Sequence, residues 1–188
     1  MVSKSHGSTK KIKQGHKGLL LIFLLIFICI SVSVVHWPAL SSQALSFDDE
    51  QYLSKNILVQ NPSWASVVRF FTEVLEPSTV QGYYQPLTMI SLMADYAQGG
   101  RSDNLRCVHR TSLILHTLNT ALVVLLLYLL FDRVWAAAAA GLLFGLHPIT
   151  VEMICWVSNR KDLLAVFFSL LSLIYYVKYT KNTEYRIQ

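Results

Sequence analysis

Four long apolar runs divide the sequence, and they leave very few folds open to it. They lie at residues 19–35, 112–131, 134–146 and 163–177. A helix needs about 20 apolar residues to cross the hydrocarbon core of a bilayer, whereas a soluble helix has polar residues between its apolar positions. Only 14% of the 188 residues are charged, against roughly a quarter in soluble domains. The sequence therefore predicts an all-α integral membrane protein with about four transmembrane helices.

Positive charges are concentrated beside the first and the last apolar run. Five lysines and no acidic residue precede residue 19, and Lys178, Lys181 and Arg186 follow residue 177. Membrane proteins keep such clusters in the cytoplasm. Residues 1–18 and 178–188 are thus predicted to be cytoplasmic tails, in a bacterial inner membrane or the endoplasmic reticulum membrane. Topology accounts for the net charge of +5, and nucleic-acid binding is not predicted.

The first apolar run has two interpretations. A basic segment before it and Ser42-Gln43-Ala44 after it are compatible with a cleaved signal peptide. However, the run is longer than the ~7–15 apolar residues of a signal-peptide core, and His36-Trp37-Pro38 resembles an interfacial anchor. The residues favour an uncleaved membrane anchor.

The segment 36–111 is predicted to be an extracytoplasmic loop with three short interfacial helices. The first is expected to begin at Ser46, and the second at Asn61, whose side chain would cap it. The third is expected to begin at Pro86 and to end before Gly99. The second helix has apolar residues at helical spacing and should lie along the membrane surface.

A polar segment, residues 147–162, separates the third and fourth apolar runs, and it should lie on the same side of the membrane as the loop. It contains the adjacent cations Arg160 and Lys161. Guanidinium and ammonium groups bind phosphate, so this pair is a candidate for holding a lipid phosphate. The alternative is an ordinary interfacial anchor of long cationic side chains. The extracytoplasmic position opposes the usual charge bias and favours a specific role.

Two further groups of ionisable residues are candidates for chemistry. A carboxylate of Asp48 or Asp49 could act as a general base, but acids are also common in the first turn of a helix, and the residues alone favour that interpretation. His109 and His116 lie seven residues apart, on one face of a helix that enters the membrane, and His116 is inside the second apolar run. An ionisable group there is a functional candidate, but the residues favour packing against a neighbouring helix.

The three cysteines do not form a recognisable disulfide framework. Cys107 and Cys155 are both predicted to be extracytoplasmic, so a bridge between them is one option. Neither their number nor their spacing requires it.

Four sequence blocks within residues 47–179 read, in order, FDDEQYLSKN, GYYQPLTMISLMADY, HRTSLILHTLNT and LHPITVEMICWVSNRKDLLAVFFSLLSLIYY. Taken together, they resemble the GT-C superfamily of membrane glycosyltransferases. The resemblance is to the membrane part of the transmembrane and tetratricopeptide-repeat O-mannosyltransferases and of their bacterial relatives. Two positions depart from the pattern: Gln85 stands in place of a basic residue, and Ser112 in place of Asn.

The resemblance implies transfer of a mannose-like sugar from a polyprenyl-phosphate carrier to Ser or Thr hydroxyls of an acceptor protein. It favours Asp48 and Asp49 as catalytic carboxylates, with Asp49 as the first choice for the base. It also implies a carrier and substrate site, for which the candidates are Gln85, His109, His147, Glu152, Arg160 and Lys161. No cofactor is implied, although a divalent ion at Asp48, Asp49 and Glu50 is left open.

The members of this family have more membrane helices than this chain and a repeat domain after them. The chain is therefore expected to be the N-terminal membrane portion of a longer transferase. The alternative is a non-catalytic assembly partner or a truncated, inactive relative.

Overall fold

A computed structural model describes residues 3–43, 49–73, 80 and 83–187 of the chain. The described residues are mostly helical and contain no β-strand. The all-α membrane fold predicted from the sequence is therefore confirmed.

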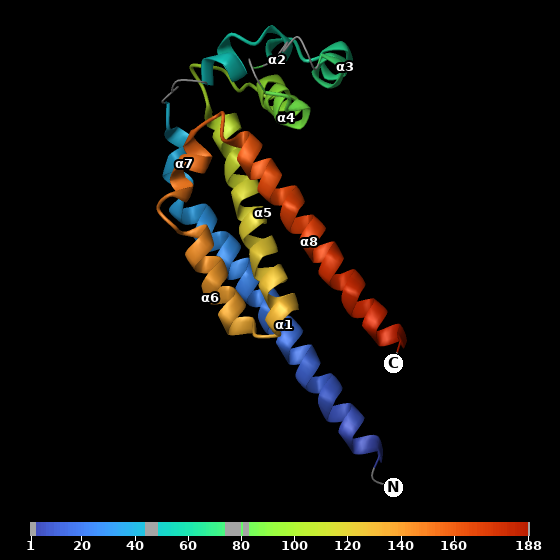
Figure 1. Ribbon diagram of the computed structural model, residues 1–188. Coiled ribbons are helices and arrows are strands. Elements are labelled where there is room, and N and C mark those ends of the chain that lie inside the picture. Colours follow the sequence, from blue (N-terminus) through green and yellow to red (C-terminus); the bar gives the residue numbers. More distant parts are fainter. Residues whose placement is uncertain (1–2, 44–48, 74–79, 81–82, 188) are drawn as a thin grey trace.

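The membrane part is a bundle of four helices: α1 (Ser3–Val35), α5 (Arg106–Phe131), α6 (Val134–Gly145) and α8 (Arg160–Ile187) (Figure 1). Within the described part of the chain, three of them, α1, α5 and α8, are long and apolar enough to cross a membrane. Helix α6 has 12 residues, which is about 18 Å of helix against a hydrocarbon core of about 30 Å. The predicted number of four spans therefore stays a prediction.

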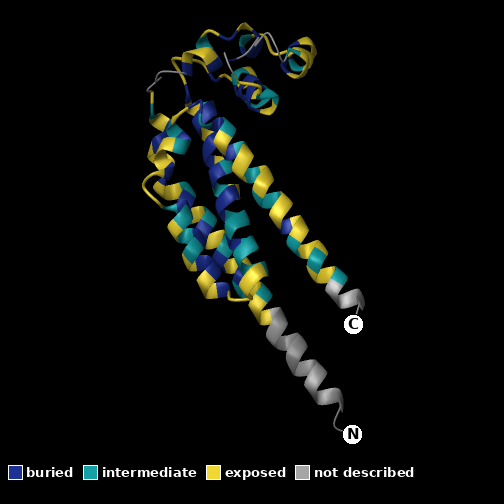
Figure 2. Cartoon of the chain, in the orientation of Figure 1, coloured by how far each residue is buried: buried dark blue, intermediate teal, exposed yellow. Residues whose placement is uncertain are grey.

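Helix α5 lies at the centre of the bundle and contacts α1, α6 and α8. Small residues on α6 let it approach its neighbours closely, because Ala137, Ala138 and Gly141 are buried against α1 and α5. More than half of the α8 side chains from residue 160 to 183 are exposed (Figure 2). In a bilayer these apolar side chains would face lipid.

Both termini lie at the same end of the bundle (Figure 1). Near that end, α5 turns sharply into α6 through Asp132, whose φ of 51° places it in the left-handed region. The carboxylate of Asp132 accepts a hydrogen bond from the ammonium of Lys17 at 2.6 Å, which ties α1 to this turn.

A small helical cap lies at the opposite end of the bundle. It consists of a π-helical turn, η2 (Glu50–Ser54), with α2 (Ile57–Gln60), α3 (Trp64–Thr72) and α4 (Pro86–Ala97). In Figure 1 α3 and α4 are seen nearly end-on, so they run across the direction of the bundle helices. A buried apolar core joins the cap to α5 and to the start of α8; it includes Tyr52, Leu53, Phe70, Met89, Leu92, Leu105, Val108 and Val157.

Two predicted helices of the loop can be compared with the structure. Helix α4 begins at Pro86 as expected, and Gly99, with φ of 100°, follows its end. The predicted start at Asn61 is wrong: α3 begins at Trp64, capped by Ser63, whose hydroxyl accepts from the Ser66 N–H at 3.1 Å. Asn61 instead ends α2. The start predicted at Ser46 lies outside the described residues.

Two short elements lie at the end of the bundle that carries the cap. A 3₁₀ turn, η1 (Trp37–Ser41), follows α1, and α7 (Thr150–Cys155) lies between α6 and α8. Both contact the cap end of α5. They bring the polar segment 147–162 beside the loop, as the predicted topology requires.

Candidate functional site

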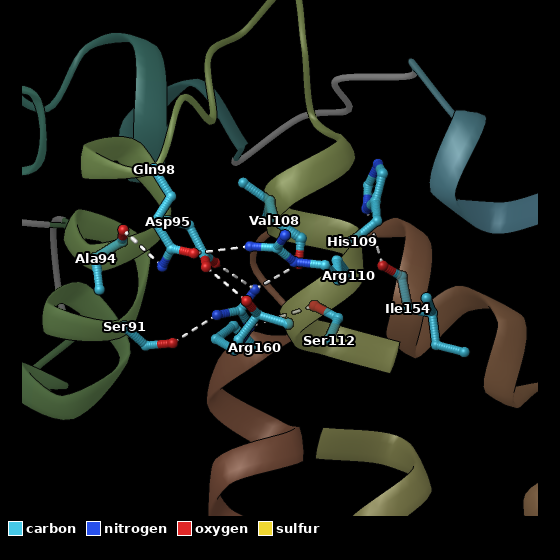
Figure 3. Close-up of polar contacts among 11 residues, drawn as sticks. Ser91, Ala94, Asp95, Gln98, Val108, His109, Arg110, Ser112, Ile154 and Arg160 are labelled. Atoms are coloured by element: carbon cyan, nitrogen blue, oxygen red, sulfur yellow. Dashed lines mark hydrogen bonds and ion pairs between the residues drawn. The ribbon is translucent and has the colours of Figure 1, made fainter. Parts of the chain in front are cut away.

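The guanidinium of Arg160 is completely buried at the start of α8 and is held by three other side chains. Its Nη2 lies 2.9 Å from Oδ2 of Asp95 and also donates to the Val108 carbonyl at 2.7 Å. Its Nε donates to the Ser112 hydroxyl at 3.2 Å and its Nη1 to the Ser91 hydroxyl at 2.5 Å (Figure 3). Arg160 thus fastens α8 to α4 and α5.

Asp95 is the acidic partner at this buried centre. Besides Arg160, it accepts a hydrogen bond from the Thr111 hydroxyl at 2.6 Å. Burial raises the pKa of the Asp95 carboxyl, and the positive charge of Arg160 opposes that shift. A buried ion pair of this kind adds little net stability, but losing either partner is costly. Its main effect is to fix how the cap sits on the bundle.

Asp49, the predicted base, is buried beside this centre. Its Oδ1 accepts a hydrogen bond at 3.0 Å from the backbone N–H of Ser158, two residues before Arg160. The anchored start of α8 therefore determines where the Asp49 carboxylate is held. Asp48, the other predicted carboxylate, lies outside the described residues.

Lys161 points away from the buried centre, toward two aromatic rings of the cap. Its ammonium lies 4.8 Å from the ring centroid of Tyr83 and 5.9 Å from that of Tyr52. Gln85 donates to the Tyr52 hydroxyl at 2.8 Å. Among the described residues, no carboxylate forms an ion pair with this half-buried cation.

These contacts define a cap junction, formed by Asp49, Tyr52, Tyr83, Gln85 and Lys161. Asp49 and Tyr52 are three residues apart, and so are Ser158 and Lys161, so two short segments lie against each other. The junction combines a buried carboxylate, an amide and a cation that has no carboxylate partner among the residues described. In such a set the carboxylate can accept a proton and the cation can neutralise an anion.

His109 is engaged through both ring nitrogens. Its Nδ1 lies 3.0 Å from the Ile154 carbonyl (Figure 3). Its Nε2 lies 3.1 Å from the Ser42 carbonyl. Both partners only accept, so a neutral ring donates to one of them at a time. His109 therefore ties α5 to α7 and to the segment after η1, and its predicted contact with substrate stays a prediction.

His147 and Glu152 lie apart from the cap junction. Both are exposed, and Nδ1 of His147 accepts from the Ile149 N–H at 3.3 Å. The polar segment 147–162 does not form one site. Arg160, Lys161 and Asp162 are successive residues of α8, so their side chains leave the helix about 100° apart and point in three different directions. The predicted contacts of His147 and Glu152 with the substrate stay predictions.

Sequence reasoning missed three residues of this region: Asp95 at the buried centre, and Tyr52 and Tyr83 at the cap junction. The one sign of Asp95 in the residues themselves is that it is the single acid in the apolar stretch LTMISLMADYA. The two tyrosines carry no signal, because aromatic residues in such loops usually fill the core. Only the packing of the cap on α8 shows what these side chains contact.

In the described part of the chain, no group of three His, Cys, Asp or Glu side chains is arranged to hold a metal ion. The divalent site left open by the sequence involves Asp48, so this finding does not test it. Cys107 and Cys155 are free thiols, so the optional disulfide is not formed.

Comparison with known proteins gives one class of relatives. Over 165 residues the chain is 30% identical to protein O-mannosyl-transferase Tmtc2 of Drosophila melanogaster, covering 86% of this chain and 17% of the relative. Human protein O-mannosyl-transferase TMTC2 is 29% identical over 143 residues, 74% of this chain and 17% of the relative. Protein O-mannosyl-transferase F38B6.6 of Caenorhabditis elegans is 28% identical over 171 residues, 88% of this chain and 24% of the relative.

The chain thus spans about a sixth to a quarter of the length of these relatives. No protein-family model matches the sequence. No solved structure matches it either.

Proposed function

We propose, from the similarity of most of this chain to protein O-mannosyl-transferases, that it is the membrane part of a glycosyltransferase acting on proteins. The sugar would be mannose-like, its donor a polyprenyl-phosphate carrier and its acceptor a Ser or Thr hydroxyl. The observation that carries the proposal is the cap junction, where Ser158, three residues before Lys161, binds Asp49, and Lys161 lies over Tyr52, three residues after Asp49.

The cap would face the extracytoplasmic side of the membrane. Two observations support this orientation. Both termini lie at the bundle end away from the cap, and the lysines of the sequence are concentrated near those termini. A carrier lipid in that leaflet would reach the cap junction with its phosphate and sugar while its chain stays among the bundle helices.

The proposed reaction is a direct displacement at the anomeric carbon of the sugar. The acceptor hydroxyl oxygen forms the new bond to that carbon, and its proton passes to the Asp49 carboxylate. The bond from the same carbon to the phosphate oxygen breaks, and polyprenyl phosphate leaves with the electron pair. The configuration at the carbon is inverted. The Ser158 N–H holds the carboxylate in place during this step.

Lys161 would bind the carrier phosphate and neutralise the charge that develops on it. Its ammonium lies over the Tyr52 and Tyr83 rings, which attract a cation while leaving it able to pair with an anion. Arg160 would act by positioning the start of α8, since its side chain is completely buried and donates to Ser91, Asp95 and Ser112.

The test is sugar transfer by the longest polypeptide that the gene encodes, in membranes with a polyprenyl-phosphate sugar. Asp49→Asn keeps an oxygen that can accept from Ser158 but cannot take up the proton. We expect it to lower the turnover rate by a factor of about 10² to 10⁴. Glu50→Gln is the matched control, because Glu50 is exposed and pairs only with Lys55 among the described residues. Unchanged turnover in Asp49→Asn would rule Asp49 out as the base.

A second candidate function is a non-catalytic membrane assembly partner. The buried Asp49 and the fully engaged Arg160 favour it, because polar residues with purely structural roles have the same appearance. It predicts that no carrier lipid binds and that Lys161→Gln changes nothing in a carrier-binding assay. Saturable carrier binding that depends on Lys161 would exclude it.

A further inference from the structure

Two adjoining pockets lie where η1 meets the cap end of α5. The pocket nearer the cap has a volume of about 240 Å³ and is lined by Trp37, Leu40, Ser41, Arg106, Cys107 and Arg110. The second, of about 280 Å³, shares Trp37, Leu40 and Arg110 with the first and continues along α1 and α5. Together they form one depression, the η1–α5 groove, and none of its lining residues belongs to the cap junction.

The part of the η1–α5 groove beyond Arg110 presents an apolar surface to the membrane. Ile114 and Leu118 line it and are 52% and 44% exposed, so in a bilayer it would open sideways to lipid. Leu118 lies eight residues after Arg110, which is about 12 Å along the helix. The two hydroxyls in this part are engaged within the protein. Thr117 donates to a backbone carbonyl of its own helix at 2.8 Å, and its oxygen lies 3.5 Å from that of Ser33.

The cap end of the groove carries two positive charges. Arg106 and Arg110 are four residues apart on α5, so they lie on one face of the helix, and both are exposed. Arg110 donates to Oε1 of Gln98 at 2.7 Å (Figure 3). Among the residues that the structure describes, neither arginine is within ion-pair distance of a carboxylate. Two such guanidinium groups attract a phosphate.

The other polar groups at this end are compatible with a phosphate. The Cys107 thiol donates to the Gln98 carbonyl at 3.4 Å, and Ser41 has an exposed hydroxyl that can donate to a phosphate oxygen. Trp37, which lines both pockets, is 64% exposed directly after α1. Tryptophan prefers the boundary between headgroups and hydrocarbon. The groove is therefore cationic at that boundary and apolar on the side of the hydrocarbon core.

This order of charge and apolar surface matches a lipid better than a protein helix. An apolar helix seated along Ile114 and Leu118 would cover the wall but would leave both arginines without an anion. A lipid with a charged head and an acyl chain satisfies both parts at once. Glycerophospholipids make up the bilayer itself, so by mass action a groove that opens sideways is filled by them before any scarce lipid.

We infer that the η1–α5 groove binds an anionic glycerophospholipid. Its phosphate lies between Arg106 and Arg110, and one acyl chain follows the wall past Ile114 and Leu118. A zwitterionic lipid carries its own ammonium group beside the phosphate, so a lipid with net negative charge is preferred. The inference does not depend on the proposed transferase activity, because the groove contains neither of the two charged residues proposed for it.

The experiment uses Trp37 as a reporter, because it lines both parts of the groove. The 188-residue chain with Trp64→Phe, Trp135→Phe and Trp156→Phe is placed in bilayers of phosphatidylcholine brominated on its acyl chains, which quenches tryptophan fluorescence. Unbrominated phosphatidylglycerol or phosphatidylcholine then replaces part of the brominated lipid. The recovery of fluorescence gives the affinity of phosphatidylglycerol relative to phosphatidylcholine at Trp37. We expect a preference of about 5- to 25-fold, since each cation near a membrane surface contributes a factor of about five.

Paired variants test whether the two arginines cause this preference. Arg106→Gln with Arg110→Gln should bring the relative affinity close to one, and both positions are exposed, so the fold should be kept. Arg133→Gln with Lys178→Gln is the matched control, because it removes the same charge from exposed positions outside the groove. That control should keep the preference. No preference in the parent chain, or the same preference in both double variants, would overturn the inference.

Two further arms complete the test. If the three tryptophan replacements unfold the chain, the difference in fluorescence between the native chain and Trp37→Phe isolates the same signal. Undecaprenyl phosphate, tested in the same way, should bind no more tightly than phosphatidylglycerol. A clear preference for undecaprenyl phosphate would assign the groove to a carrier lipid and would also overturn the inference.

Discussion

Arg160 and Lys161 are neighbours in the sequence, yet their side chains have opposite surroundings. Arg160 is completely buried and faces Asp95, whereas Lys161 is half-buried and lies over two tyrosine rings. The same residue pair therefore provides a structural anchor and a cation available to a ligand. Substitution of Arg160 should therefore affect stability, whereas substitution of Lys161 should affect ligand binding.

Replacing Arg160 with Met should destabilise the protein strongly, because Asp95 would remain buried without its cation. Loss of one partner of a buried pair typically costs about 3–5 kcal/mol. The free energy of unfolding in detergent measures this loss. Arg69→Met is the matched control, since Arg69 pairs with Glu73 on an exposed face of α3 and should matter little. Equal stability of the two variants would contradict the structural role of Arg160.

Replacing Lys161 with Gln should weaken carrier binding and leave the fold intact. A hydrogen bond to a charged group is worth more than a neutral one, so we expect the KM for the carrier lipid to rise about 10- to 100-fold. Lys178→Gln, at the other end of α8, is the control. A fall in kcat with an unchanged KM would show that Lys161 does not hold the phosphate.

The sequence pointed to most of the residues of the cap junction, but it did not show which of the candidate residues lie there and which lie elsewhere. Asp49, Gln85 and Lys161 were candidates, and the structure brings them together. Arg160, His109, His147 and Glu152 were candidates for the same site, and the structure places them elsewhere. The pattern of residue types does not show which direction each side chain takes from a helix start, since that depends on where α8 meets α4 and α5.

At the scale of helices, the close approach of α6 to α1 and α5 depends on glycine. A Cβ atom built on Gly145 would lie 2.7 Å from Cγ2 of Val32 and 2.8 Å from Cγ2 of Thr120. The Gly145 carbonyl also lies 2.9 Å from Nε2 of His36 and 3.0 Å from Nε2 of His116. Because a carbonyl only accepts, both imidazole rings must carry a proton on Nε2.

Gly145→Ala should therefore separate α6 from α1 and α5. Overpacking of this kind typically costs about 1–3 kcal/mol, measurable as a fall in the free energy of unfolding in detergent. Gly18→Ala is a clean control, because a Cβ at Gly18 would meet nothing within 4 Å. An equal free energy of unfolding for Gly145→Ala and Gly18→Ala would contradict the tight packing at Gly145.

The helices themselves were predictable where local signals are strong. The apolar runs correspond to α1, α5 and α8, and the Pro86 and Gly99 boundaries of α4 follow from backbone preferences. The start of α3 was missed because Asn61, Pro62 and Ser63 all carry helix-start signals, and local preference did not separate them. The buried Asp95–Arg160 pair joins residues 65 positions apart, which no local pattern reveals.

For the molecule as a whole, the proposal requires the cap and the termini to lie on opposite sides of the membrane. Single cysteines at Asp103, in the turn before α5, and at Arg133, in the turn before α6, test this in a chain whose native cysteines are replaced. A membrane-impermeant maleimide added to intact cells or sealed vesicles of known orientation should label position 103 from the extracytoplasmic side. Position 133 should react only after permeabilisation. The reverse pattern would place the cap junction in the cytoplasm.

The central claim is that the carrier phosphate is bound at the cap junction. The most direct measurement uses a polyprenyl-phosphate probe with its photoreactive group next to the phosphate, cross-linked in membranes and mapped by peptide mass spectrometry. The account predicts adducts on the segments that contain Tyr52, Tyr83 and Lys161, and a loss of those adducts in Lys161→Gln. Adducts confined to the residues that line the η1–α5 groove would contradict it.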